Sequence, residues 1–159
     1  MSSSLSGKLS IEVEAKSSAP ALYEANSKRL YETPKLCPNY IQKVDLVEGK
    51  WEEVGAVFNW HLIYEGKTVI SQEIYESIDD EKLSVTFKVI GGLLVEAYKS
   101  FKFVFQAIPK KQGCLARWTV EYEKLNAEIP DPKQMLQFAA DLIKEIDDNL
   151  MIKSKAEYL

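Results

Sequence analysis

Apolar and polar residues alternate along most of the chain. In the first such run, residues 9–14, Leu, Ile and Val alternate with Ser and Glu, which is the pattern of a half-buried strand. Six further strands are predicted at residues 41–48, 55–64, 67–78, 82–90, 95–108 and 114–124. The turns between these six are short and rich in Gly, Asp, Lys and Pro, so consecutive strands should pair as an antiparallel meander.

Helical spacing replaces alternation in two places. After Ser18 and Pro20, which can start a helix, apolar residues share one face up to about residues 29–31, and a very short helical piece is predicted at 35–37 between prolines. Near the end of the chain, Asp131, Pro132 and Gln134 suggest a capping box. The residues that then recur with helical period predict one long amphipathic helix: Met135, Phe138, Ala139, Leu142, Ile143, Ile146 and Leu150.

These elements predict an α+β fold in a single domain spanning residues 1–159. A curved sheet of seven antiparallel strands would bury its apolar face by wrapping around the long C-terminal helix, with the two short helices at one end. Such a sheet can enclose a hollow or a solid core, and periodicity alone does not distinguish the two.

Composition narrows the partners and the compartment. The net charge of −4 and the pI of about 5.2 disfavour nucleic acid and anionic membranes, which attract basic proteins. No apolar run approaches the roughly 20 residues of a membrane span, and the first residues lack the apolar segment of a signal peptide. Two distant cysteines, Cys37 and Cys114, do not form a disulfide framework, so we expect a reduced, cytoplasmic protein without membrane insertion.

The larger side chains of each strand define the face that should point inward. In the strand predicted at residues 55–64, His61, the only histidine, falls on the opposite, outward face. A single histidine is a poor candidate for a metal site, which needs three or four ligands. The full inward set from strands and helix is Phe58, Trp60, Leu62, Tyr64, Val85, Phe87, Val89, Phe101, Phe103, Phe105, Ala116, Trp118, Val120, Tyr122, Met135, Phe138, Leu142 and Ile146. Judged by periodicity alone, filling a core is the simpler role for these residues.

Lys99 is the exception among the inward positions. Strict alternation back from Phe101 points it inward near the start of its strand. Its stem could pack inside while its ammonium reaches water. Alternatively, it could pair with an acidic ligand or act as a general acid.

The loop VEGKWEEVG (residues 47–55) contains Gly49 and Gly55 between two predicted strands. A phosphate site needs several free backbone N–H groups, a helix N-terminus or a well-placed lysine. Here Lys50 stands alone against three glutamates, and a strand follows rather than a helix. A hairpin turn is therefore the favoured interpretation, and no nucleotide or other cofactor is expected.

The chain resembles the plant major latex protein-like members of the Bet v 1 superfamily over nearly its whole length. The matching segments are Gly7-Lys8-Leu9, VDLVEGKWEEVGAV at 44–57, SVTFKVIGG at 84–92, EAYKSFKF at 96–103, RWTVEYEKLN at 117–126 and PDPKQMLQFAADLIKEID at 130–147. The resemblance implies a helix-grip fold around a large apolar cavity that binds hydrophobic plant metabolites. It also implies a role in defence or stress.

Three functions stay open at this point. The first is a carrier of sterols, flavonoids, terpenoids, alkaloids or fatty acids, working as a monomer, with a dimer as the alternative. The second is a cofactor-independent isomerase or cyclase, with Tyr64, Lys99 and Tyr122 as candidate catalytic residues. The third is a ligand-gated interaction module, for which the apolar turn at residues 91–94 is the only cue.

Overall fold

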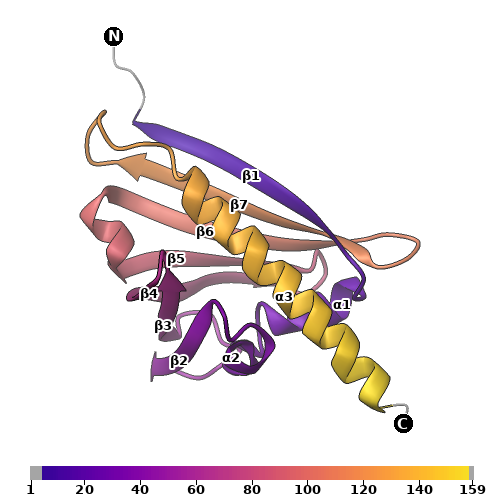
Figure 1. Cartoon of the computed structure of the whole chain (residues 1–159). Helices are drawn as coiled ribbons and strands as arrows, with labels where there is room; N and C mark the ends of the chain where they lie inside the picture. Colours follow the sequence, from indigo (N-terminus) through magenta and orange to yellow (C-terminus); the bar gives the residue numbers. More distant parts are fainter. Residues whose placement is uncertain (1–4, 158–159) are drawn as a thin grey trace.

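One antiparallel sheet of seven strands forms the body of the protein. The computed structural model describes residues 5–157, and the sheet order is β1-β7-β6-β5-β4-β3-β2 (Figure 1). The first and second strands of the chain therefore lie at opposite edges of the sheet, and the α+β prediction is confirmed. The strands are β1 (Ser6–Ala15), β2 (Ile41–Glu48), β3 (Val57–Tyr64), β4 (Lys67–Asp79), β5 (Ser84–Gly92), β6 (Tyr98–Pro109) and β7 (Cys114–Lys124).

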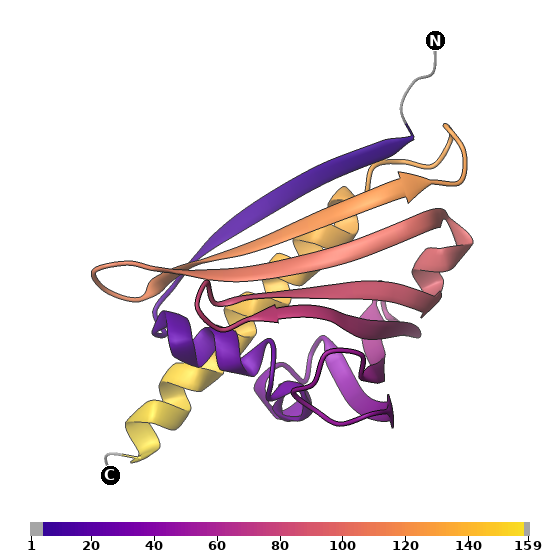
Figure 2. The ribbon, with the colours of Figure 1, turned by 180° about the vertical axis from the view of Figure 1, so that it is seen from behind.

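A single long helix, α3 (Lys133–Glu157), crosses one face of this sheet. Figure 2 shows the same arrangement from behind, with the sheet in front of the helix. The connection from β1 to β2 contains α1 (Ala19–Ala25), η1 (Leu30–Glu32) and α2 (Thr33–Leu36), and a further short turn, η2 (Leu93–Glu96), precedes β6. The short helices α1 and α2 sit at one end of the sheet, as predicted, and they lie beside the second half of α3.

The first helix is shorter than the sequence predicts. Ser18 caps it by accepting a hydrogen bond from the Ala21 N–H at 3.3 Å. At its other end, Asn26 Nδ2 donates to the Leu22 carbonyl and Ser27 Oγ donates to the Tyr23 carbonyl. These side chains satisfy the last carbonyl groups of the helix, so the helix ends at Ala25 instead of continuing to residues 29–31.

The start of α3 also differs from the predicted capping box. The Asp131 carboxylate accepts a hydrogen bond from the Tyr122 hydroxyl at 3.0 Å and pairs with Lys124 Nζ at 2.8 Å. The helix begins with the Leu136 N–H donating to the Pro132 carbonyl. Asp131 therefore ties the segment before α3 to strand β7.

The far half of α3 is held by polar contacts as well as by packing. The Asp147 carboxylate accepts the backbone N–H groups of Lys16 and Ser17 at 2.9 and 2.8 Å. Asn149 Nδ2 donates to the Leu36 carbonyl at 2.7 Å. These bonds fix α3 against the turn after β1 and against α2.

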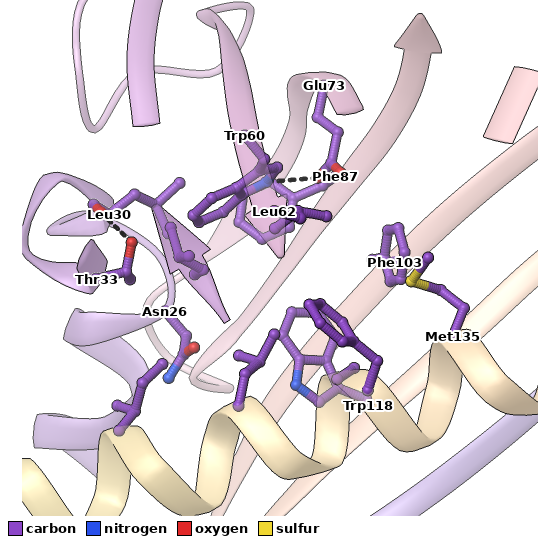
Figure 3. Close-up of a pocket in the computed structure, with 15 residues that line it drawn as sticks. Asn26, Leu30, Thr33, Trp60, Leu62, Glu73, Phe87, Phe103, Trp118 and Met135 are labelled. Carbon is purple, nitrogen blue, oxygen red and sulfur yellow. Dashed lines mark hydrogen bonds between the residues drawn. The ribbon is translucent and has the colours of Figure 1, made fainter. Parts of the chain in front are cut away.

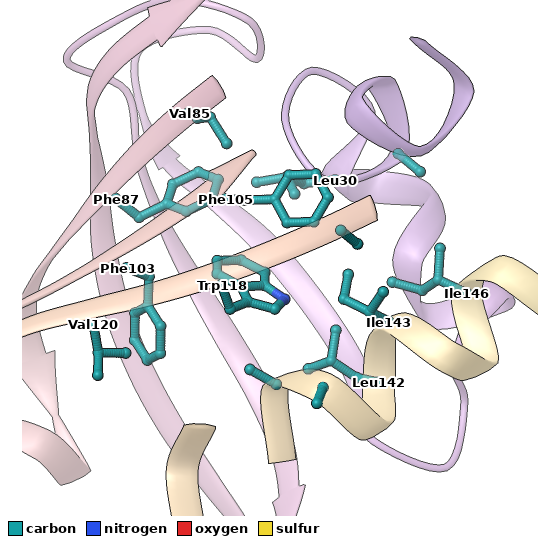
Figure 4. Close-up of a cluster of buried hydrophobic side chains, with 14 of the residues drawn as sticks. Leu30, Val85, Phe87, Phe103, Phe105, Trp118, Val120, Leu142, Ile143 and Ile146 are labelled. Atoms are coloured by element: carbon teal, nitrogen blue, oxygen red, sulfur yellow. The ribbon is translucent and has the colours of Figure 1, made fainter. Parts of the chain in front are cut away.

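The core lies between the sheet and α3. Figure 4 shows Phe87, Phe105 and Trp118 from the strands facing Leu142 and Ile146 from the helix. Register shifts occur between β2 and β3, between β4 and β5, and near the start of β6. Such bulges bend and twist a strand, which lets the sheet curve around the helix.

Candidate functional site

A small apolar cavity remains between the concave face of the sheet and α3 (Figure 3). Its volume is about 50 Å³, where a single water needs about 10–15 Å³. The side chains that line it come from strands β2 to β7, from α3 and from the segment between β1 and β2. They are Asn26, Leu30, Thr33, Ile41, Trp60, Leu62, Glu73, Phe87, Phe103, Trp118, Met135, Phe138, Ala139, Leu142 and Ile146.

The predicted inward set divides into three groups. Nine of its members line the cavity: Trp60, Leu62, Phe87, Phe103, Trp118, Met135, Phe138, Leu142 and Ile146. Eight others are buried in the surrounding core: Phe58, Val85, Val89, Phe101, Phe105, Ala116, Val120 and Tyr122. Tyr64 lies at the mouth, with its ring 5.2 Å from that of Phe138.

This mouth is a wider hollow of about 310 Å³ at one end of the cavity. Tyr64, Leu94 and Tyr98 line it together with residues 130–134 before and at the start of α3. Met135 lines both the mouth and the inner cavity. A methionine side chain is unbranched and flexible, and Met135 is the residue that the linings of the two spaces share.

The inward orientation predicted for Lys99 is wrong. Strand β6 carries a bulge there, since Tyr98 pairs with Lys124 while Ser100 pairs with Glu123. The extra residue breaks the alternation, so Tyr98 is buried and 71% of the Lys99 side chain is exposed. Lys99 Nζ instead lies 3.5 Å from Glu123 on the outer surface.

Six lining residues are absent from the predicted inward set, and Glu73 is the ionisable one among Asn26, Leu30, Thr33, Ile41, Glu73 and Ala139. Glu73 lies on β4, lines the cavity and is only 4% exposed. Its Oε1 accepts a hydrogen bond from Trp60 Nε1 at 3.1 Å, and its Oε2 accepts one from Ser71 Oγ at 2.8 Å. Burial raises the pKa of this carboxyl to about 7, although the two hydrogen bonds act in the opposite direction.

The inward orientation of Glu73 could have been predicted from the register of the β3–β4 hairpin. The turn Glu65-Gly66 has positive φ at both positions, 52° and 77°, as in a two-residue type I′ turn. Such a turn pairs Tyr64 with Lys67 and therefore Phe58 with Glu73. Directly opposed residues share a face of the sheet, so an inward Phe58 implies an inward Glu73.

Other polar groups of the cavity are uncharged. Trp118 is 8% exposed, and its indole Nε1 has no hydrogen-bond partner among the described residues. Thr33 Oγ1 donates to the Leu30 carbonyl at 2.6 Å, and the Asn26 amide nitrogen is held by Leu22. Glu73 is therefore the one ionisable group among the described residues that line the cavity.

The three candidate catalytic residues do not converge on one point of the cavity. Lys99 lies outside, and Tyr64 lies at the mouth. The Tyr122 hydroxyl is engaged by Asp131, and burial together with this carboxylate raises its pKa to about 12. A phenol with so high a pKa stays protonated near neutral pH.

The glycine loop forms a hairpin connection between β2 and β3, as predicted. Gly49 and Gly55 both adopt positive φ, 82° and 95°, which glycine tolerates without strain. The N–H groups of Glu53, Gly55 and Ala56 donate to backbone carbonyls. Those three amides are therefore not free to cradle a phosphate.

His61 faces away from the cavity, and its Nε2 lies 3.1 Å from an Asp45 oxygen on β2. The sequence showed no carboxylate partner for it, because the pair forms across two strands. Within residues 5–157, no group of three or more His, Cys, Asp or Glu side chains is placed to hold a metal ion. None of the helices in the same range has the length and apolarity to cross a membrane.

Comparison with known proteins agrees with this architecture. The chain is 40% identical over 151 residues to MLP-like protein 43 of Arabidopsis thaliana, covering 94% of this chain and 96% of that protein. A crystal structure of ginseng major latex-like protein 151 from Panax ginseng superposes with a TM-score of 0.88 at 35% identity, covering 91% of this chain and 97% of that one. A norcoclaurine synthase from Thalictrum shares the fold at 19% identity, with a TM-score of 0.71 over 96% of this chain and 99% of that one.

The sequence pattern of the pathogenesis-related protein Bet v 1 family matches residues 4–153. This match spans every strand and nearly all of α3. The chain therefore belongs to the pathogenesis-related protein Bet v 1 family, among its major latex protein-like members.

Proposed function

We propose that the protein binds and carries a small hydrophobic molecule between the sheet and α3. The observation that carries this proposal is the cavity itself, which is lined almost wholly by aromatic and aliphatic side chains. Small-molecule sites usually combine such a lining with a few polar groups. Membership of a family that the sequence resemblance associates with hydrophobic metabolites supports the same function.

The volumes indicate where the ligand would lie. Ligand sites usually measure about 300–1,000 Å³, whereas the inner cavity has about 50 Å³ and the mouth about 310 Å³. We therefore expect the ligand to occupy the mouth and to reach inward past Met135. Sterols, flavonoids, terpenoids, alkaloids and fatty acids all have apolar skeletons suited to this lining.

Binding is favoured over catalysis because the candidate catalytic side chains lie apart from one another. We also place the carrier in the reducing cytoplasm, since Cys37 and Cys114 are buried and unpaired. A role in defence or stress, which the family resemblance implies, stays a prediction. The monomeric state of the protein is likewise a prediction.

Fluorescence titration with the neutral probe N-phenyl-1-naphthylamine tests the proposal. We expect saturable binding with a Kd of about 1 μM, equivalent to about −8 kcal/mol. Ala139→Trp should abolish it by filling the cavity, because Ala139 lines the wall. Lys144→Trp on the exposed side of α3 is the matched control.

Circular dichroism would establish that both tryptophan variants fold. If the unaltered protein shows no saturable binding, the carrier function is wrong. Binding that survives Ala139→Trp in a folded protein would place the probe elsewhere and would also contradict the proposed site.

A further inference from the structure

We propose that Glu73 anchors a basic nitrogen, so that the preferred ligand is an apolar molecule with one protonatable amine. This inference rests on the proposed carrier function and names the chemical class of its ligand. Glu73 belongs neither to the inward residues predicted from the strand pattern nor to the three candidate catalytic residues.

The geometry leaves Glu73 able to accept further hydrogen bonds. A carboxylate has about four lone-pair sites, and Trp60 and Ser71 use one on each oxygen. Both donors come from the sheet, one from β3 and one from β4 itself. They hold the carboxyl in place, and this count leaves one lone pair on each oxygen without a donor from the described residues.

The protein supplies no cation to this carboxyl. Glu73 is the only ionisable residue among the described residues that line the cavity. Trp60 from β3, Phe87 from β5 and the aliphatic side chains of α3 contribute no charge. Tyr75, two residues along β4, carries a hydroxyl that donates to the Ser27 carbonyl at 2.6 Å.

An ammonium group would complete the site. A buried charge is costly unless it is paired, and a ligand ammonium would stabilise the ionised form of Glu73 and lower its pKa from about 7. A carboxylate ligand would instead add a second negative charge to the same cavity.

Three ligands that share a naphthalene skeleton test this anchor. We would measure how 2-naphthylmethylamine, 2-naphthylmethanol and 2-naphthoic acid displace N-phenyl-1-naphthylamine at about pH 8, above the pKa of Glu73. The amine should bind about tenfold more tightly than the alcohol, as expected for a charged hydrogen bond. The acid should bind most weakly.

Glu73→Gln keeps the shape of the side chain and removes its charge. It should weaken amine binding about tenfold and change alcohol binding less than about threefold. Amine affinity should fall from about pH 8 to about pH 5.5 in the unaltered protein and show a smaller fall in the variant. Glu76→Gln, on the same strand but paired with Lys102 on the outer surface, is the matched control and should leave amine binding unchanged.

The possible outcomes distinguish a failure of the Glu73 anchor from a failure of the proposed carrier function. If the probe and the alcohol bind but the amine has no advantage, or if its advantage survives Glu73→Gln, the anchor is wrong and the carrier function stands. Preferred binding of the acid would also overturn the anchor. If neither the probe nor any of the three ligands binds, the carrier function fails and the anchor fails with it.

Discussion

The two halves of the concave face of the sheet are built differently. On β6 and β7, Phe101, Phe105 and Val120 are at most 2% exposed and pack tightly, with the Phe105 and Trp118 rings 5.1 Å apart. On β3 and β4, Trp60 is only partly buried, and Glu73 contributes a carboxyl at the edge of free space. Phe103 on β6 and Trp118 on β7 also border the cavity, but only β4 brings an ionisable group to it.

This difference separates stability from recognition within one layer of the fold. Burial of apolar surface stabilises a protein in proportion to its area, and side chains that already face empty space contribute fewer contacts. We therefore expect substitutions of the fully buried residues of β6 and β7 to affect unfolding alone, and substitutions around Glu73 to affect binding as well.

Phe105→Ala should show the largest effect. Its ring is fully buried outside the lining of the cavity, so its removal should lower the free energy of unfolding by about 3–5 kcal/mol. Urea denaturation measures the loss, and titration at a temperature where the variant is folded should give an unchanged probe affinity. A small stability loss would show that this half is not tightly packed.

Glu73→Gln should stabilise the protein at alkaline pH. Because burial raises the pKa from 4.5 to about 7, the folded state holds the proton more tightly than the unfolded state. Stability therefore falls as pH rises from about 4.5 to 7 and stays low above that range. The shift corresponds to a loss of about 3 kcal/mol.

The glutamine variant cannot ionise and should not show this loss. The unfolding free energies of the unaltered protein and of Glu73→Gln should therefore be similar at about pH 5 and differ at about pH 8. Equal pH dependence in the two proteins would mean that Glu73 titrates normally and is better solvated than the structure indicates.

Leu142→Ala should cost about 1–2 kcal/mol, less than the 2–5 kcal/mol typical of a packed core leucine. The reason is that Leu142 borders the cavity, whereas its neighbour Ile143 is fully buried away from it. Ile143→Ala is the matched control and should fall in the higher range. Only Leu142→Ala should alter probe affinity, because it enlarges the site.

Chemical denaturation would measure the unfolding free energies of the Leu142→Ala and Ile143→Ala proteins, and fluorescence titration would measure their probe affinities. If Leu142→Ala costs as much as Ile143→Ala and leaves binding unaltered, α3 packs on a filled core. The carrier function would then lack its structural basis.

Lys99→Ala should have the smallest effect. Its ammonium pairs with Glu123 on the surface, and exposed pairs of this kind contribute about 0–1 kcal/mol. We expect unchanged probe affinity and an unfolding free energy within about 0.5 kcal/mol of the original protein. A strong loss of binding would indicate that the side chain reaches the mouth of the cavity in solution.

Sequence patterns predicted the fold better than the site. Clear alternation and short turns sufficed for the order of the strands, and the bounds predicted for β2 agree with the structure. Strand β4 gives a weaker signal, because Ile70 and Ile74 face outward while Ser71 and Glu73 face inward. A polar inward face could be found only through pairing with β3.

The other errors also have local physical causes. One extra residue in β6 turned Lys99 outward. A prediction that assumes strict alternation of inward and outward residues cannot foresee such a bulge. Asn26 and Ser27 ended α1 early through bonds from their own side chains. The volume of the cavity depends on how far α3 stands from the sheet, which is a tertiary distance that no local pattern encodes.

The open sheet leaves β1 and β2 each with one unpaired side, and this arrangement bears on solubility. Exposed strand edges can recruit another chain and start aggregation. Charged residues flank both edges here, with Glu12 paired to Arg117 beside β1 and Lys43 paired to Asp45 on β2. A second copy docking edge to edge would have to desolvate these groups, so we expect the protein to resist association through its strand edges.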